Sequence, residues 1–215
     1  MNIEKLNSKY LPLQPEKRIE ELYNDFSNIL YTSSFGTTAV YLLHLFSKVH
    51  PGQAVHFLDT TYHFSQTLDY RDELIRLLNL NVVVLKGEAW RNEFTKQDRT
   101  WKKDPDLCCS VNKVEPLEKI KGSYDVWVSG LMHSQNTHRE GLKIFEEKDG
   151  LVKFYPIIDQ TEEIAAAYIK DNHLPLHPLA SQGYQSVGCS HCTLQGRARE
   201  GRWVNKSKSE CGLHL

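Results

Sequence analysis

The sequence has no long hydrophobic run, since no apolar stretch approaches the ~20 residues that a helix needs to cross a bilayer. Residues 1–26 mix acidic and basic side chains and lack an apolar core, which excludes a secretory signal and an acid-poor transit peptide. The formal net charge is only −1, so the chain has no global basic field to attract nucleic acid. We therefore expect a cytoplasmic protein without a membrane or nucleic-acid partner, in which local clusters of arginine and lysine bind any anionic ligand.

Cysteine is scarce, with five in 215 residues, and the number is odd. A reducing compartment disfavours a structural disulfide framework, and cysteines that cluster there more often bind metal or perform redox chemistry. The sequence also lacks internal repeats and low-complexity segments. Its length suits one domain with a sizeable core, and its 40% apolar and 25% charged residues are typical of a globular protein.

Short apolar runs alternate with amphipathic stretches along the chain. The apolar spacing predicts helices over residues 16–30, 39–49, 64–78 and 162–169, and strands over residues 29–32, 55–58, 82–85, 126–129 and 152–155. This alternation predicts an α/β fold with a mostly parallel sheet that is covered by helices on both faces. Such sheets bind ligands at the carboxyl ends of their strands, where the loops meet helix N-termini.

The composition changes at Gly183, after which glycines, basic residues and three of the five cysteines replace the apolar periodicity. We expect residues 1–182 to form the α/β domain and residues 183–215 to form a C-terminal functional segment over the edge of the sheet. Within this segment Cys211 stands apart, near Lys206, Lys208 and His214, whose positive charges favour a reactive thiolate. Without further support, a lone cysteine near a terminus is an incidental surface thiol.

The adjacent pair Cys108 and Cys109 and the C-x-x-C pair Cys189 and Cys192 are the strongest chemical signal. Four soft thiolates suit either a tetrahedral zinc ion or an iron–sulfur cluster. Neighbouring side chains on a helix point about 100° apart, a geometry that follows from 3.6 residues per turn, so they ligate one ion poorly. The separate iron corners of a cuboidal cluster accept them more easily. The alternative is that Cys108 and Cys109 are small buried hydrophobic residues.

Candidate anion-binding residues lie in three places. Residues 33–38 combine small hydroxyl side chains with one glycine at a predicted strand-to-helix turn, where backbone N–H groups could cradle a phosphate or sulfate. This turn is not a Walker A loop, because no glycine–lysine pair follows, and it could simply cap a helix. Arg197, Arg199 and Arg202 could clamp an anion with paired N–H donors or form a solvated basic loop. Lys113 could place a charge between the cysteines and a ligand.

Eight stretches, spread over nearly the whole chain, together carry a family resemblance. They are SSFG (33–36), LDT (58–60) with HF (63–64), DPDLCC (104–109), KVEPL (113–117), FYP (154–156), GYQSVGCSHCT (183–193), REGRW (199–203) and ECGLH (210–214). In this order they resemble the iron–sulfur branch of the assimilatory adenylyl sulfate (APS) and phosphoadenylyl sulfate (PAPS) reductases. The stretch over residues 130–139 keeps Gln135 and Arg139 but lacks an arginine pair that many members have.

The resemblance implies an adenine-nucleotide α-hydrolase-like fold and a reductase of sulfate assimilation and cysteine biosynthesis. By this resemblance the Cys211 thiolate attacks the sulfate sulfur of APS, AMP leaves, and thioredoxin or glutaredoxin releases sulfite from the resulting S-sulfocysteine. The site residues that it implies are Ser33, Ser34, Gly36 and Asp59 in the nucleotide pocket, Lys113, Arg139, Arg199, Arg202 and His214 around the phosphate–sulfate group, and Cys108, Cys109, Cys189 and Cys192 on a four-iron, four-sulfur cluster.

Three alternatives stay open at this point. Members that use PAPS usually lack the four cluster cysteines, so the set favours APS, although a PAPS reductase or a dual-substrate enzyme has the same chemistry. An ATP-consuming relative needs an S-G-G-x-D-S turn, which residues 33–38 do not form. A non-catalytic iron–sulfur redox sensor would need no turnover. Since no thioredoxin-like domain follows Cys211, we expect the reductant to be a separate protein, and the sequence leaves the oligomeric state open, a homo-oligomer included.

Overall fold

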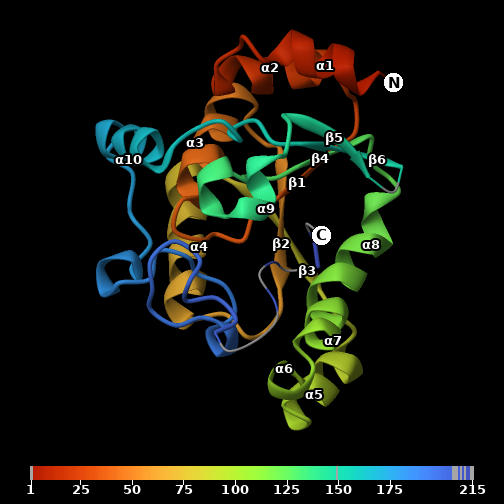
Figure 1. Ribbon diagram of the computed structural model, residues 1–215, viewed down its shortest axis with the longest axis vertical. Coiled ribbons are helices and arrows are strands. Elements are labelled where there is room, and N and C mark those ends of the chain that lie inside the picture. The colour runs from red at the N-terminus through yellow and green to blue at the C-terminus, as the bar shows by residue number, and fades with distance from the viewer. Residues whose placement is uncertain (1, 149, 205–207, 209, 211, 214–215) are drawn as a thin grey trace.

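The computed structural model describes residues 2–148, 150–204, 208, 210, 212 and 213, and its centre is a six-stranded sheet (Figure 1). The strand order is β3-β2-β1-β4-β6-β5; neighbouring strands are parallel except β5, which is antiparallel to β6. The predicted α/β fold with a mostly parallel sheet is therefore confirmed. The strands are β1 (Ile29–Thr32), β2 (Ala54–Asp59), β3 (Asn81–Lys86), β4 (Val126–Val128), β5 (Phe145–Lys148) and β6 (Leu151–Phe154).

Helices connect the strands and cover both faces of the sheet (Figure 1). None of the described helices is long and apolar enough to cross a membrane. The α-helices are α1 (Ile3–Tyr10), α2 (Pro15–Asp25), α3 (Ala39–Val49), α4 (Ser65–Leu78), α5 (Ala89–Gln97), α6 (Thr100–Lys103), α7 (Pro105–Cys109), α8 (Glu115–Lys121), α9 (Thr137–Glu140) and α10 (Glu162–Asp171). Shorter turns are the π-helical η1 (Ser110–Val114) and the 3-10 helices η2 (His133–Gln135), η3 (Ala180–Gln182) and η4 (Ser190–Cys192).

The central strands are buried on both faces because successive side chains alternate between two cores. In β1, Tyr31 belongs to the large core under α2, α3, α4 and α10, while Leu30 belongs to a smaller core on the opposite face. In β4, Val126 and Val128 face the large core, and Trp127 joins Leu30 in the small one. This two-sided burial explains why these strands read as continuous apolar runs in the sequence.

Helix α2 ends five residues earlier than the apolar spacing predicts, and the predicted helix over residues 16–30 is wrong beyond Asp25. Phe26 is already extended, and Asn28 shares three hydrogen bonds with Asp125: its N–H (2.9 Å) and its Nδ2 (3.1 Å) donate to the carboxylate, and its carbonyl accepts from the Asp125 N–H (2.8 Å). These bonds draw the chain into register with β4. Ile29 and Leu30 therefore begin strand β1 rather than finish a helix.

Candidate active site

A cavity of about 220 Å³ opens at the carboxyl ends of β1 and β4. Its wall includes residues 33, 34 and 36–38, directly after β1, and residues 129–131, directly after β4. The C-terminal segment closes it with residues 185–189, Ala198, Arg199, Arg202, Trp203, Glu210 and Leu213. The cavity thus lies where a parallel sheet is expected to bind a ligand.

The turn over residues 33–38 is fixed from several directions. Its Ser33 N–H donates to the carbonyl of His56 on β2 (3.1 Å), and the Ser33 hydroxyl accepts from the Phe35 N–H (3.2 Å). Phe35 has a φ of +50° and a fully buried ring that packs edge-on against Phe57. The Thr37 hydroxyl donates to the carbonyl of Gln185 (2.7 Å), which ties the turn to the C-terminal segment.

This turn also presents the start of α3 to the cavity. Ser33, Ser34, Gly36 and residues 37–39 all line the wall. The N-terminus of a helix carries a partial positive charge and orphan N–H groups, which favour a bound anion. The predicted phosphate- or sulfate-binding turn therefore has suitable geometry at the cavity.

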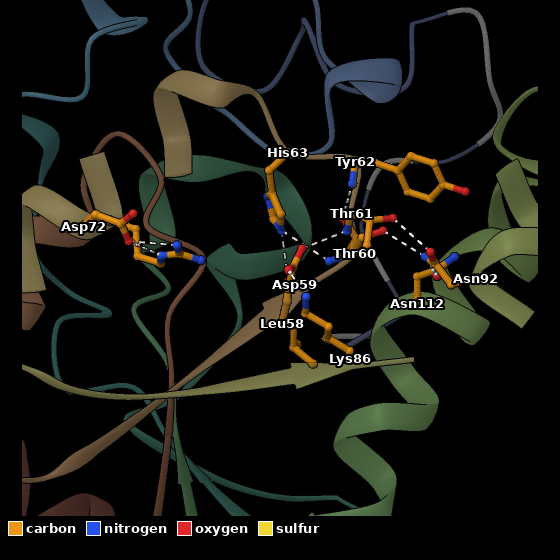
Figure 2. Close-up of polar contacts among 11 residues, drawn as sticks. Leu58, Asp59, Thr60, Thr61, Tyr62, His63, Asp72, Lys86, Asn92 and Asn112 are labelled. Carbon is orange, nitrogen blue, oxygen red and sulfur yellow. Dashed lines mark hydrogen bonds and ion pairs between the residues drawn. The ribbon is translucent and has the colours of Figure 1, made fainter. Parts of the chain in front are cut away.

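Asp59 and Arg197 are the described candidate ligand-binding residues that do not line the cavity. Figure 2 shows the Asp59 carboxylate bonded to the Thr61 N–H (2.8 Å) and paired with Lys86 (3.0 Å). Burial alone would raise the pKa of this carboxyl, but the Thr61 and Lys86 contacts outweigh burial and lower it. Asp59 therefore orders the loop after β2 as a carboxylate, and its contact with a nucleotide stays a prediction.

His63 lines the cavity and belongs to one of the stretches that carry the family resemblance, but sequence reasoning assigned it no role. Its Nε2 lies 3.0 Å from the Leu58 carbonyl, which can only accept, and 3.4 Å from the Thr60 backbone nitrogen, which can only donate; the shorter contact favours the tautomer with the proton on Nε2 (Figure 2). Burial lowers the pKa of His63, which favours the neutral ring. Its buried Nδ1 has no hydrogen-bond partner in the described part of the chain, and a neutral ring leaves this atom as an acceptor.

The four clustered cysteines come together beside this cavity from two distant segments. Cys108 and Cys109 end α7, which Asp104 caps by accepting from the Leu107 N–H (2.9 Å). The backbone of Cys189 pairs with that of His63 in an isolated antiparallel β-bridge, and Cys192 follows one turn later, in η4. The first three are buried and Cys192 is half-buried.

A buried polar network joins the loop after β2 to the segment that follows the cysteine pair (Figure 2). Asn92 on α5 donates to the Thr60 carbonyl (3.1 Å) and to the Asn112 side-chain oxygen (2.6 Å). Asn112 in turn donates to the Cys108 carbonyl (2.9 Å). Buried amides left without partners would be costly, so this network fixes α7 and η1 relative to β2.

The electrostatic environment of the cysteines differs from one to another. Burial, followed by the charges of the other three thiolates, raises the pKa of the Cys108 thiol to about 12. Burial also opposes ionisation of Cys189, but Lys113, the Thr60 hydroxyl (3.3 Å from the sulfur) and Arg202 together lower its pKa. Among the described residues, no three His, Cys, Asp or Glu side chains form a group that could hold a metal ion.

Two of the predicted anion-binding arginines are bound by a carboxylate of the C-terminal segment. Glu210, only 1% exposed, accepts from Arg139 Nε (2.9 Å) and Nη2 (2.6 Å) through one oxygen. Its other oxygen accepts from Arg199 Nη2 (2.8 Å). Sequence reasoning missed Glu210, because nothing in the local pattern indicates which cations an acidic side chain meets.

The third arginine, Arg202, lies between an aromatic ring and a glycine. Its guanidinium is 4.5 Å from the centroid of the Trp203 ring, and Nη1 is 3.4 Å from the Ser186 hydroxyl. Its Nε has no hydrogen-bond partner within the described ranges. A Cβ atom at Gly188 would lie 2.2 Å from Arg202 Nη2, so the guanidinium rests directly on the glycine backbone.

The cavity therefore brings together most of the predicted binding residues. Those that line it are Ser33, Ser34, Gly36, Lys113, Arg139, Arg199 and Arg202. Cys189 also lines it and joins the cysteine group to the cavity wall. Cys211 and His214 lie outside the described residues, and so does Lys206.

Comparison with known proteins gives consistent results. A family profile described as the phosphoadenosine phosphosulfate reductase domain matches residues 28–195. The adenosine 5'-phosphosulfate reductase of Bacillus mycoides (strain KBAB4) is 36% identical over 203 residues, which covers 90% of this chain and 87% of that protein. The protein of the same name from Halalkalibacterium halodurans is 38% identical over 195 residues, which covers 86% and 84%.

Solved structures extend the likeness to the fold. The phosphoadenylyl-sulfate reductase of Candida auris, in a phosphate complex, has a TM-score of 0.80 and 27% identity, with 89% of this chain and 96% of that chain covered. The FMN adenylyltransferase of Candida glabrata has a TM-score of 0.60 at 15% identity, with 90% and 70% covered. This second likeness shows the fold alone.

Proposed function

Because the chain belongs to the phosphoadenosine phosphosulfate reductase domain family, we propose that it reduces APS to sulfite and AMP in sulfate assimilation. The observation that carries this proposal is a single cavity whose wall contains the 33–38 turn, Arg202 with Lys113, and one of the four gathered cysteines, next to Arg139 and Arg199, which are paired with Glu210. A nucleotide that ends in two linked anions needs such a set of donors. Relatives that match about nine-tenths of the chain carry the name adenosine 5'-phosphosulfate reductase.

The proposed cofactor is a four-iron, four-sulfur cluster on Cys108, Cys109, Cys189 and Cys192. A zinc ion needs its donors to meet at one atom, whereas a cuboidal cluster takes one thiolate at each iron corner. Cys108 packs with Cys189, Cys192 packs against them, and the charges of the other three thiolates act on Cys108. By its chemistry, this set of four soft thiolates fits a cluster. Bound there, the cluster would supply a polarisable, charged group beside Lys113 at the cavity wall.

The proposed reaction has two stages. The turn and the cations hold the nucleotide, and the Cys211 thiolate attacks the sulfate sulfur. A sulfur–sulfur bond forms, the sulfur–oxygen bond to the phosphate breaks, and AMP leaves with the electron pair. A separate dithiol protein of the thioredoxin or glutaredoxin class then supplies two electrons: it becomes a disulfide, sulfite departs, and the Cys211 thiol is restored.

The neutral His63 suits a role in nucleotide binding. Its Nε2 is committed to the Leu58 carbonyl, so the ring cannot turn without losing that hydrogen bond. The buried Nδ1 acceptor then fits a donor such as an adenine amino group or a ribose hydroxyl. A buried acceptor without a partner is costly, which favours a ligand that satisfies it.

Substrate choice tests the proposal against the PAPS alternative, which the name of the Candida auris relative favours. With reduced thioredoxin present, kcat/KM for sulfite release should be higher for APS than for PAPS. A 3'-phosphate would need further cations, and two of the three arginines at the cavity are already paired with Glu210. A tenfold preference for PAPS, about 1.4 kcal/mol of transition-state binding, would make the chain a PAPS reductase. No turnover of either substrate would favour a redox sensor.

Gly188→Ala should weaken nucleotide binding without unfolding the protein. The new methyl group collides with the end of the flexible Arg202 side chain, so the guanidinium moves away from the cavity. We expect the dissociation constant for AMP to rise about tenfold, equivalent to about 1.4 kcal/mol. Calorimetry on the parent, Gly188→Ala and Gly122→Ala measures this, since a Cβ at Gly122 meets nothing within 4 Å. Equal affinities in all three proteins would remove Arg202 from the binding site.

A further inference from the structure

The contact between Glu210 and two arginines has a consequence for the nucleophile, because Cys211 is the next residue in the sequence. On the basis of the proposed function, we infer that Glu210 is a positioning residue: its carboxylate docks the C-terminal segment on Arg139 and Arg199 and holds Cys211 at the cavity. Under this inference Arg139 serves the protein's own tail, whereas the family resemblance assigns it to the substrate.

The contact of Glu210 with Arg139 and Arg199, called the clamp below, is buried, and its hydrogen bonds are satisfied on both carboxylate oxygens. Glu210 is 1% exposed and Arg139 is 4% exposed, and both carboxylate oxygens accept hydrogen bonds from arginine. Asn136 adds a fourth donor to the carboxylate, through Nδ2 at 3.2 Å. A buried charge is tolerated only when it is paired and hydrogen-bonded, and removal of one partner leaves the other uncompensated. The tail is therefore bound by an interaction that is strong only in this docked arrangement.

Helix α9 presents Arg139 to the tail. The Asn136 side chain caps the helix by accepting from the Arg139 N–H (3.0 Å), and the same side chain donates to Glu210. Arg139 Nη1 donates to the Gln135 side-chain oxygen, which also accepts from the Met132 N–H (3.2 Å). Each of the three guanidinium nitrogens thus has a protein acceptor: Glu210 for Nε and Nη2, and Gln135 for Nη1.

A second anchor lies on the other side of Cys211 in the sequence. Leu213 packs against the small core that contains Leu30, Leu117 and Trp127. A Cβ at Gly212 would lie 3.2 Å from a methyl carbon of Val114, so the tail passes close to η1. The nucleophile is therefore flanked by an ionic anchor one residue before it and an apolar anchor two residues after it.

A competing interpretation is that Glu210 only occupies the anion site until a substrate displaces it. The two interpretations predict opposite effects of Glu210→Gln, which removes the charge but keeps the shape. If Glu210 competes with the substrate, its removal tightens APS binding and does not slow the transfer of the sulfonate group. If Glu210 positions Cys211, the variant binds the nucleotide normally but transfers slowly, because the thiolate spends less time at the substrate.

The test compares anaerobically prepared holoenzyme of the parent, Glu210→Gln and the exposed-carboxylate control Glu147→Gln. We expect hydrogen exchange over residues 208–213 to rise at least tenfold in Glu210→Gln alone. The single-turnover rate of AMP release at saturating APS should fall at least tenfold, while the dissociation constant for AMP stays within twofold. Tighter nucleotide binding without a slower transfer, or unchanged exchange, would overturn the inference.

Two further variants keep the test decisive if Glu210→Gln folds poorly. Leu213→Ala loosens the apolar anchor without a buried charge, and it should also raise exchange and slow transfer. Arg139→Gln combined with Glu210→Gln should transfer no more slowly than either single variant, because both remove the same contact; additive losses would contradict the clamp. Hydrogen exchange needs no turnover, so it measures docking of the tail even if the parent protein forms no adduct with APS. The lack of an adduct in the parent protein would refute the proposed function and not the docking.

Discussion

Replacement of Cys211 by serine is expected to reduce sulfite release from APS by about a hundredfold or more. A serine hydroxyl is far less ionised than a thiol near neutral pH and is a much poorer nucleophile toward sulfur. The iron content and the affinity for AMP should not change, because the proposed cluster ligands and the cavity turn lie elsewhere. Steady-state turnover with reduced thioredoxin measures the loss, and iron analysis with AMP calorimetry provides the control.

Truncation after Glu210 should have the same effect on turnover. It removes Cys211 together with the Leu213 anchor but leaves the cavity wall formed by residues 33–38 and 129–131 in place. Retention of more than a few per cent of parental turnover by Cys211→Ser would mean that another thiol carries the chemistry.

The second large effect concerns the metal. Anaerobically purified protein should be brown, with about four irons and four sulfides per chain. Cys189→Ser should lose the colour and most of the activity, because a serine oxygen is a harder, poorer ligand for iron in such a cluster. Cys108→Ser should do the same, since Cys108 packs with Cys189 in one buried group.

Cys211→Ser serves as the matched control for these variants, because it also removes one thiol but should keep the full iron content. The measurements are iron and sulfide analysis and visible absorbance. Stoichiometric zinc in a colourless parent protein would show that the four cysteines form a different kind of site.

The parallel core of the fold could be predicted because its strands are buried on both faces. The predicted bounds of β1 and α3 agree with the structure, since a continuous apolar run and a strong helical period mark them. Strand β5 was missed: its sequence, FEEK, buries only Phe145 and forms because it pairs with β6. The helices over residues 89–121 were missed because several are only one or two turns long and expose apolar residues such as Trp90 and Phe94.

The site divides in the same way. Residues 33–38 and the cysteine pairs carry local signals, a small-residue turn after a strand and a thiol spacing, so the sequence could mark them as candidates. The partner of Arg139 is Glu210, 71 residues away, and no local pattern connects the two. His63 is a similar case. It is a candidate binding residue because of its burial and its fixed Leu58 contact, and its neighbours in the chain do not indicate either.

The most direct test of the central claim is a single turnover without reductant. Reduced holoenzyme mixed with APS, in the absence of thioredoxin, should release one AMP per chain and gain one sulfonate group on the peptide that carries Cys211, as shown by mass spectrometry. Reduced thioredoxin should then discharge the adduct as an equal amount of free sulfite. Continuous AMP release without an adduct, or an adduct on one of the other four cysteines, would contradict the account.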